Sequence, residues 1–474
     1  MIYKKTWLSY FLWAVYTCLT GVMLANYAIL FWQKKINAVI NYGTALFVVF
    51  MFGAAAGIYI LVRYIFGKVR EKYSMSGHTK LLWEIFIALS IFCAGLIYRV
   101  SLYLQNINSL AETSYYQLAT VKAEPSAESM VHGASYLYTM CLSFILSFLG
   151  NKVAVAVWMQ ILIQMVTVFL AYFAVRRLAG RIPACIAMLV LAVSSVYAGQ
   201  ILVMSPESLF FALYLAGLLI VGGCVKNVCQ CRTGRWQAFW GAVLSGFIVG
   251  FLTYLDAIAV TLVIFLFSFL TGKKYRETAV SLIAGGLTFA GMLALNAYSD
   301  YTEIGKIAKA WFELYRTNAS VDYLFYRTEF SVVECLVLVM LAFWLIMAFW
   351  NRRKTQNVTP WFLLLFLLAP TPLAATGVLS YQAWSIFLWG VVAGIGVQQS
   401  FVYEKDVPIK QEASVESEPV TEEEAQPEKP RFLDNPLPLP KKHEKRTMDY
   451  QYEVGKDMMK FDIEIAENDD FDIL

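Results

Sequence analysis

The chain has 474 residues, of which 59% are hydrophobic and only 15% are charged, and its mean hydropathy is +0.57. Soluble domains carry charge on about a quarter of their residues, so this composition excludes an ordinary soluble protein and indicates an integral membrane protein. The apolar runs are about 20 residues long, which favours spanning helices over a β-barrel. The net charge of +4 conceals an asymmetry, because residues 402–474 hold 20 acids and only 10 lysines and arginines.

In chain order, the apolar runs predict about twelve membrane-spanning helices. They are Trp7–Trp32, Gly43–Phe66, Leu82–Leu104, Val153–Val175, Ile182–Met204, Pro206–Val225, Gln237–Thr253, Ala257–Leu270, Ala279–Ala297, Ser331–Trp350, Pro360–Thr376 and Tyr381–Phe401. The first run is too long for a cleaved signal sequence, so we expect it to remain as the first helix. The predicted fold class is therefore an all-α polytopic membrane protein.

Short basic loops decide the predicted orientation. The runs "YKK", "GKVREKY", "RRLAGR", "KNVCQCRTGR", "GKKYRE" and "NRRK" all fall on one side if these spans hold. The positive-inside rule makes that side the cytoplasm, and both chain termini then lie there as well. The loops 105–133 and 298–330 face outward in this topology.

One apolar segment, Ala134–Gly150, does not fit as a span. It is short, and a span there would move "RRLAGR" outside and reverse every later loop. Its first turns carry tyrosines and serines, which suit a half-wet position. We therefore expect a helix that lies at the outer interface or re-enters the membrane partway.

Residues 402–474 differ in kind from the rest of the chain. The run "EASVESEPVTEEEAQPEKP" is acidic and rich in Pro, Glu and Ser, which is typical of disorder, and "NPLPLPKK" favours polyproline II. We expect a disordered cytoplasmic tail that solubilises the chain. The alternative is a short docking segment for a protein partner, because hydrophobic residues recur between the acids in "MMKFDIEI".

Charges near the outer ends of spans are candidate functional residues, because a charge in a membrane is costly. Arg99 lies near the outer end of the third span, Glu207 opens a helix in "SPES", and Asp256 separates two apolar half-runs. Arg99 has the alternative of snorkelling to lipid headgroups. Glu207 has the alternative of a first-turn acid, with Ser205 as N-cap and Pro206 at the first helical position.

The first outward loop holds further candidates. Helical spacing in "ETSYYQLA" gathers four side chains on one side: Glu112, Tyr115, Tyr116 and Ala119. An amphipathic interfacial helix has the same spacing. His132 is either an ordinary interfacial histidine or a contact to a metal or substrate.

The second outward loop is basic and aromatic. Its cations are Lys306, Lys309, Arg316 and Arg327. Such a loop suits a lipid phosphate or a glycan, and it suits equally a solvated face against lipid headgroups. The sequence has no Walker loop, G-x-S-x-G, H-E-x-x-H or C-x-x-C motif. An outward-facing enzyme has no ATP or nucleotide sugar, so its activated substrate must arrive on a lipid.

Several stretches together resemble the membrane-embedded C-type glycosyltransferases, which include protein O-mannosyltransferases and aminoarabinose lipid A transferases. They are "YRVSLYLQN", "LAETSYYQLA", "HGASYLYTMCLSFILSFLGN", "FAVRRLAGRIPACIAMLVLA", "SPESLFF" and "GAVLSGFIVGFLTYLD", between about residues 82 and 297. The resemblance implies a helical core over residues 82–401, with outward loops 105–152 and 298–330. It also implies two additional N-terminal helices over residues 1–81 and an appended tail, residues 402–474. A short helix along the outer surface is part of this layout.

The resemblance implies transfer of a sugar from a polyprenyl phosphate to a glycan, lipid or protein acceptor. Glu112 is similar to the first-loop acid that acts as general base or helps to hold a divalent metal, with His132 as a tentative second ligand. Glu207 is similar to the second acid, and the family's usual acidic pair is Ala111–Glu112 here. Tyr115, Tyr116 and the cations of the second loop are then candidate substrate contacts. Arg99 has no firm counterpart in the family and is a candidate contact only for its position at the outer helix end.

Two other classes remain open from the sequence. A transporter or flippase for a lipid-linked glycan should show internal repeats with broken helices, and the break near Asp256 is a partial case. A catalytically inactive scaffold would recruit partners through residues 402–474.

Overall fold

The computed structural model of the protein describes residues 2–4, 7–36, 39–72, 77–110, 112–121, 133–229, 234–267, 269, 274–299, 305–306, 309, 337, 339–342, 344, 354–356 and 381–401. Within these residues the regular structure is helical apart from one short antiparallel pair, in which β1 (Ile2–Lys4) lies beside β2 (Lys354–Gln356). The helical fold class predicted from the sequence is therefore confirmed in its coarse form.

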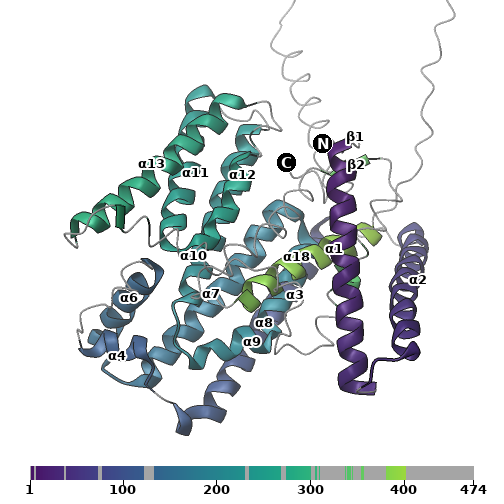
Figure 1. Ribbon diagram of the computed structural model, residues 1–474, viewed down its shortest axis with the longest axis horizontal. Coiled ribbons are helices and arrows are strands. Elements are labelled where there is room, and N and C mark those ends of the chain that lie inside the picture. The colour runs from purple at the N-terminus through teal and green to yellow at the C-terminus, as the bar shows by residue number, and fades with distance from the viewer. Residues whose placement is uncertain are drawn as a thin grey trace, which may run out of the picture. The chain divides into compact units, whose positions relative to one another are not determined.

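Long helices joined by short turns make up most of the described chain (Figure 1). The first part contains α1 (Trp7–Phe31), the π-helical turn η1 (Trp32–Ile36), α2 (Tyr42–Lys72), α3 (Gly77–Asn106), the 3-10 turn η2 (Ile107–Ser109), α4 (Ser114–Val121) and α6 (Gly133–Leu149). The second part contains α7 (Val153–Ala179), α8 (Arg181–Val193), α9 (Ser195–Gly199), η3 (Gln200–Leu202), α10 (Glu207–Cys229), α11 (Arg235–Leu255), η4 (Ala257–Leu262), α12 (Val263–Phe267), α13 (Tyr275–Ser299) and α18 (Tyr381–Phe401).

Six helices of the described chain are long and apolar enough to cross a membrane. Their spanning parts are Tyr42–Ile65, Leu81–Ser109, Val153–Ala179, Glu207–Val228, Arg235–Leu255 and Tyr275–Tyr298. The protein is therefore a multi-span membrane protein, as the composition predicted. The predicted span Pro360–Thr376 and most of Ser331–Trp350 lie outside the described residues. The short segment before α7 is a single 17-residue helix, α6, as expected.

The predicted continuous span Ile182–Met204 is wrong. The helix α8 ends at Val193, and the chain continues as the short helix α9 and the turn η3. Ser194 causes the break: its backbone is extended (φ −54°, ψ 117°), and its hydroxyl oxygen accepts a hydrogen bond from the Tyr197 N–H at 3.3 Å. A serine side chain that caps a new helix competes with continuation of the old one.

The predicted span Ala257–Leu270 also differs from the structure. The chain after α11 forms the 3-10 helix η4 and then the five-residue helix α12. Asp256 separates α11 from η4 with an extended backbone (φ −157°, ψ 136°), and its Oδ1 accepts from the Ile258 N–H at 3.0 Å. The break therefore replaces one regular span with a bent and partly 3-10 segment.

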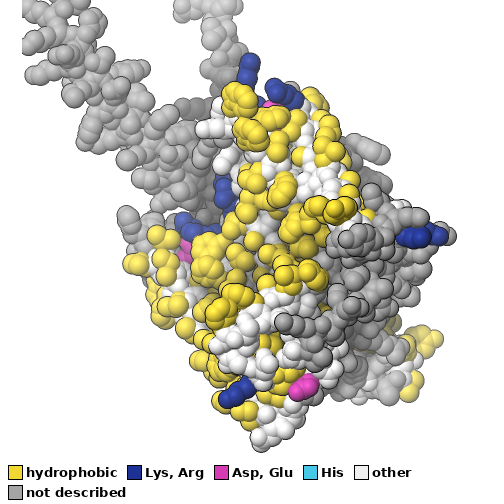
Figure 2. Space-filling model, turned by 90° about the vertical axis from the view of Figure 1, so that its left-hand side faces the viewer, with side chains coloured by type: hydrophobic (Ala, Val, Ile, Leu, Met, Phe, Trp, Pro, Cys, Tyr) yellow, Lys and Arg dark blue, Asp and Glu magenta, His cyan; other side chains and the backbone are white. Residues whose placement is uncertain are grey.

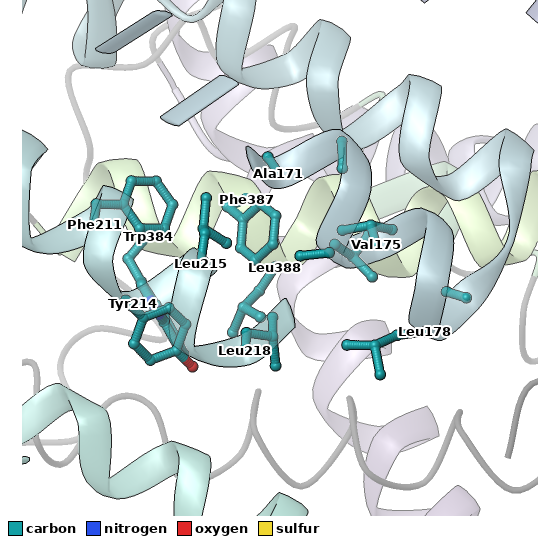
Figure 3. Close-up of a cluster of buried hydrophobic side chains, with 14 of the residues drawn as sticks. Ala171, Val175, Leu178, Phe211, Tyr214, Leu215, Leu218, Trp384, Phe387 and Leu388 are labelled. Atoms are coloured by element: carbon teal, nitrogen blue, oxygen red, sulfur yellow. The ribbon is translucent and has the colours of Figure 1, made fainter. Parts of the chain in front are cut away.

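A hydrophobic core joins α7, α8, α10 and α18. Figure 3 shows apolar side chains of α7, α10 and α18 meeting there. Phe211 of α10 meets Phe387 of α18 edge to face, with ring centroids 5.6 Å apart. Tyr214 meets Trp384 in the same geometry at 6.1 Å. Edge-to-face pairs add about 0.5–1.5 kcal/mol to area burial, so these contacts fix α18 in the core despite its distance in the sequence.

Glycines allow α11 and α13 to pack closely, side by side (Figure 1). A Cβ on Gly250 would lie 2.2 Å from the carbonyl oxygen of Gly285, and one on Gly246 would lie 2.1 Å from that of Ser281. Small residues at such positions let membrane helices approach backbone to backbone. The two contacts advance together along both helices, so α11 and α13 run parallel.

The face of the molecule over α13 and α6 is largely hydrophobic, and its charged side chains lie toward the margins (Figure 2). The exposed apolar side chains of these helices include Ile283, Leu287, Leu295, Phe144 and Phe148. A contiguous apolar surface of this kind marks a membrane or partner contact. It agrees with the lipid-facing surface expected of a membrane protein.

Candidate functional site

Arg99, near the C-terminal end of α3, is fully buried, with 0% of its surface exposed. Its Nε donates to Gln164 Oε1 at 2.7 Å, and its Nη1 donates to the carbonyl oxygen of Gly95 at 3.1 Å. Nη1 also donates to the carbonyl of Ala192 at 2.9 Å, and Nη2 donates to that of Leu191 at 3.1 Å. These bonds use four of the five guanidinium N–H groups. Burial excludes the alternative in which Arg99 snorkels to headgroups.

The end of α8 compensates this buried charge. Leu191 and Ala192 lie in the last turn of α8, where the final carbonyls have no donor within the helix and carry partial negative charge. Within the described chain, no carboxylate forms an ion pair with Arg99. The guanidinium also lies 5.5 Å from the ring centroid of Tyr197. Arg99 therefore acts on its surroundings by positioning Gln164 and Tyr197.

Two glutamines of α7 extend the polar contacts away from Arg99. Gln164 Nε2 donates to the carbonyl oxygen of Tyr197 at 2.7 Å and to Ser208 Oγ at 3.4 Å. Gln160 Nε2 donates to the same Ser208 Oγ at 3.0 Å and to the carbonyl of Ser205 at 3.1 Å. The sequence analysis missed both glutamines. Their i, i+4 spacing in an otherwise apolar span is the signal that places them on one helix face.

Tyrosines connect these glutamines to α4. The Tyr138 hydroxyl of α6 donates to Gln160 Oε1 at 3.1 Å. The ring of Tyr115 in α4 meets the Tyr138 ring edge to face, with centroids 6.1 Å apart. Tyr116 is buried, and burial raises the pKa of its phenol above the ordinary value, with a smaller contribution from Glu112. The predicted residues Tyr115 and Arg99 thus belong to one continuous set of contacts.

Glu112 does not share the helix of these tyrosines, so that prediction is wrong. The helix α4 begins at Ser114, and Thr113 Oγ1 accepts from the Tyr116 N–H at 3.4 Å, as an N-cap residue does. Glu112 precedes the cap and is exposed. The local capping interaction therefore places the carboxylate just outside the first turn of α4.

The turn Tyr197–Glu207, which comprises the end of α9, η3 and the first residue of α10, contains buried oxygen atoms without hydrogen-bond partners in the described chain. Gln200 Nε2 donates to Glu207 Oε2 at 2.7 Å. Three other atoms of this turn have no partner within the described chain: the Tyr197 hydroxyl, Gln200 Oε1 and Ser205 Oγ. Their residues are 1%, 8% and 6% exposed. Such atoms are uncommon in native structures, so their presence on one turn calls for a ligand or water partner.

The start of α10 agrees only partly with the reading of "SPES" as a helix start. Glu207 lies in the first turn, and Pro206 supplies the carbonyl that accepts from the Phe210 N–H at 3.0 Å. Ser205 was expected to cap the helix through its side chain, but its Oγ has no partner among the residues that the structure describes. Met204, just before it, has φ +51°, a left-handed conformation that is uncommon for residues other than glycine.

Asp256, after the end of α11, is a buried acid with one unsatisfied oxygen. It is 3% exposed, and its Oδ2 has no partner within the described residues. Burial raises the pKa of its carboxyl to about 7, and the hydrogen bond from the Ile258 N–H opposes part of this rise. The preceding residue, Leu255, packs against Gly133 at the start of α6, where a Cβ would lie 3.4 Å from the Leu255 Cα.

At the opposite end of α3, Glu84 forms an ion-pair cluster that the sequence analysis did not predict. Its carboxylate is 2.7 Å from Arg176 Nε and 3.3 Å from Arg181 Nε, and it accepts a hydrogen bond from the Tyr172 hydroxyl. The side chains of Arg176 and Arg181 are about one-third exposed, whereas that of Glu84 is 4% exposed. A lone acid in the apolar stretch "LLWEIF" is the signal that points to such a partner.

The remaining predicted residues do not join these contacts within the described chain. Lys306 and Lys309 are exposed, whereas His132, Arg316 and Arg327 lie outside the described residues. No three His, Cys, Asp or Glu side chains of the described part group as metal ligands. The tentative metal site at Glu112 and His132 stays a prediction, because His132 lies outside the described residues.

No protein-family model matches the sequence, and no curated protein is significantly similar to it. At the end of the bundle that contains Arg99, the structure brings together a rigid polar network, a half-buried acid and several unsatisfied oxygen atoms. A constellation of this kind can bind and orient a polar ligand beside an apolar environment.

Proposed function

We propose that this membrane protein is a glycosyltransferase that moves a sugar from a polyprenyl-phosphate donor to an extracytoplasmic glycan, lipid or protein acceptor. One observation carries the proposal. An uninterrupted set of contacts runs from Tyr115, three residues after Glu112, through Tyr138 and Gln160 to Ser205, two residues before Glu207. The two acids singled out by sequence thus lie on segments attached to the same end of the helix bundle.

The proposed reaction needs a base and a stabilised leaving group. An acceptor hydroxyl loses its proton to the Glu112 carboxylate as its oxygen bonds to the anomeric carbon of the sugar. The bond between that carbon and the phosphate oxygen breaks, and polyprenyl phosphate leaves with the electron pair. Glu112 is exposed, so an acceptor can reach it from solvent.

Positively charged side chains are expected to stabilise the leaving phosphate. Lys306, Lys309, Arg316 and Arg327 are the proposed contacts, and Lys306 and Lys309 are exposed. Arg99 is assigned a different role, because its donors are already bonded to protein oxygens. It holds Gln164 and Tyr197 in place beneath the turn that leads to Glu207. No step is assigned to a metal.

The charges at the two ends of the bundle support an outward-facing site. Arg176, Arg177 and Arg181 lie at the Glu84 end, where Gly223 of α10 packs against Arg177. Positive charges favour the cytoplasmic side of a membrane. The Arg99 end then faces outward, where a lipid-linked donor is the available activated sugar.

The proposal is tested by Glu112→Gln in cells that produce the protein, with surface glycans and lipid-linked sugars measured by mass spectrometry. We expect loss of one sugar from the envelope glycans and accumulation of its lipid-linked donor. Glu277→Gln is the matched control, because Glu277 lies in the first turn of α13, beside the start of α11 and remote from Asp256. This variant should leave both quantities unchanged.

An unchanged glycan in cells that contain normal amounts of the Glu112→Gln protein would contradict the proposal and favour a scaffold. Accumulation of the donor on the inner leaflet alone would favour a flippase. Immunoblots of both variants supply the protein amounts that this comparison needs.

A further inference from the structure

We propose that the turn Tyr197–Glu207 is a binding subsite for the hydroxyl groups of a neutral sugar ring. This inference rests on the proposed function and assigns it a place: the turn recognises the sugar of the donor, whereas the lipid phosphate binds elsewhere. The atoms that carry it are the unpartnered oxygens of Tyr197, Gln200 and Ser205, each at least nine-tenths buried.

Leaving these oxygens without partners is costly. Transfer of a hydroxyl or amide group out of water without a compensating hydrogen bond disfavours the folded state. Packing alone does not account for three such groups on a single turn, whereas a bound molecule that supplies hydrogen bonds accounts for them together. Gly199 lies within the same turn, and a Cβ built there would meet no heavy atom within 4 Å, so there is space beside it.

The orientation of Gln200 defines the chemistry of the ligand. Its amide nitrogen donates to Glu207 Oε2, which leaves the acceptor Oε1 as the unpartnered atom. The Tyr197 and Ser205 hydroxyls each accept as well as donate. A site with an amide oxygen and two hydroxyls beside a carboxylate favours a ligand rich in O–H donors. Phosphate has only acceptor oxygens when ionised, and the Glu207 carboxylate repels it.

The turn is held rigidly, as a selective subsite requires. Gln160 donates to the Ser205 carbonyl, and Gln164 donates to the Tyr197 carbonyl. Two side chains of α7 therefore hold the backbone of the turn at Tyr197 and at Ser205. Met204 keeps its left-handed backbone beside Ser205. Uncommon backbone conformations of this kind persist where the surrounding structure determines them, and they cluster at ligand sites.

The test uses the full chain in lipid nanodiscs and compares two ligands by native mass spectrometry. One is undecaprenyl phosphate, and the other is the same lipid phosphate bearing glucose, galactose, mannose or arabinose. We expect the wild-type protein to prefer at least one sugar-bearing lipid. The double variant Tyr197→Phe/Ser205→Ala should lower that preference by about 10-fold or more, because two hydrogen-bonding groups are removed.

Two controls separate binding from folding. The Ser205 hydroxyl has no partner within the described chain, and the Tyr197 hydroxyl lies near Thr167 and Ser208 without a hydrogen bond of ordinary geometry. The thermal midpoint of the unliganded double variant should therefore fall less than that of Ser208→Ala, and binding of bare undecaprenyl phosphate should not change. Ser208→Ala is the structural contrast, because Ser208 Oγ accepts from Gln160 and Gln164, and its loss should lower the midpoint. Ser90→Ala, on an exposed face of α3, should change neither binding nor stability.

The subsite is overturned if the wild type shows no preference for any sugar-bearing lipid, or if the double variant keeps the full preference because water alone satisfies these oxygens. It is also overturned if the variant weakens both lipids equally. The binding ratio requires no turnover. If the double variant lowers the preference but no sugar is transferred in cells, only the proposed function is contradicted. If sugar is transferred but the double variant keeps the preference, only the subsite is contradicted.

Discussion

The two ends of α3 each hold a buried charge, and they compensate it in different ways. Glu84 is surrounded by charged partners, because Arg176 and Arg181 both approach its carboxylate. Arg99 has no ionic partner in the described chain and is bonded to carbonyl and amide oxygens. At about 1.5 Å of rise per residue the two side chains start about 22 Å apart along the helix axis.

This difference separates an end held by ion pairs from the end that carries the proposed site. At the Glu84 end, full charges of opposite sign join α3, α7 and α8 in a closed cluster. At the Arg99 end, the partial negative charge of the α8 terminus stabilises the guanidinium. No carboxylate of the described chain pairs with it. Glu207, at the start of α10, accepts a hydrogen bond from the neutral amide of Gln200.

The largest effect in this comparison is expected for Arg99→Met. The variant leaves Gln164 Oε1 and the carbonyls of Leu191 and Ala192 without their donor, so we expect a loss of about 3–4 kcal/mol in unfolding free energy. Arg99→Lys keeps the charge at the helix end and should lose roughly half as much. Both are measured by unfolding of the purified protein in detergent. A Met variant as stable as the wild type would show that Arg99 is not a structural centre of this end.

Glu84→Gln should have the next largest effect. It leaves the two arginines without a carboxylate, and we expect about 2–3 kcal/mol of destabilisation, less than for a fully buried pair because both arginines are partly exposed. The loss should shrink in high salt, which screens the wild-type cluster, whereas the loss in Arg99→Met should not respond to salt. An equal salt response in the two variants would remove the distinction between the ends.

Asp256 extends the comparison to a buried acid that has neither a cation nor a second donor among the described residues. Its pKa rises from about 3.9 in the unfolded chain to about 7 in the folded protein. Its favourable contribution is therefore complete below about pH 4 and is lost as the pH rises through 7. Relative to the wild type, Asp256→Asn should gain about 2–3 kcal/mol between pH 5 and pH 8. Unfolding measured at both values should show this gain, and a difference that does not change with pH would contradict it.

Tyr138→Phe should have the smallest effect, about 1 kcal/mol, because it removes one hydrogen bond to Gln160 and leaves the contact with the Tyr115 ring in place. If the contacts between α4 and Gln160 position the site, the variant should also reduce sugar transfer more than it reduces stability. Tyr136→Phe, an exposed tyrosine of the same helix, is the control for both measurements. Equal transfer by the two variants would show that the Tyr138 hydrogen bond plays no part in the site.

Local signals in the sequence predicted the long helices well. The predicted segment Tyr381–Phe401 coincides with α18, and Val153–Val175 lies within α7, because a long apolar run has few alternatives to a helix in a membrane. Breaks inside apolar runs were harder to predict. Ser194 interrupts Ile182–Met204 by a side-chain cap, a local interaction that hydropathy does not register.

The candidate site was predicted only in part, because its partners are set by tertiary packing. Sequence alone singled out Arg99 and Glu207, but the acceptors of Arg99 are backbone carbonyls of α8, whose identity depends on helix register. The partners of Glu84 are likewise 92 and 97 positions along the chain, at Arg176 and Arg181. Unpartnered atoms such as Ser205 Oγ become visible only once the surrounding residues are placed.

The central claim is that the Arg99 end faces outward and carries the site, and cysteine labelling in intact cells tests it most directly. Gln117 on α4 and Gln237 on α11 are both exposed, and each is replaced by cysteine in a background whose eight native cysteines are alanine. A membrane-impermeant maleimide should label Gln117→Cys in intact cells and Gln237→Cys only after permeabilisation. Labelling of Gln117→Cys only after permeabilisation would contradict the account, because the site would then face the cytoplasm.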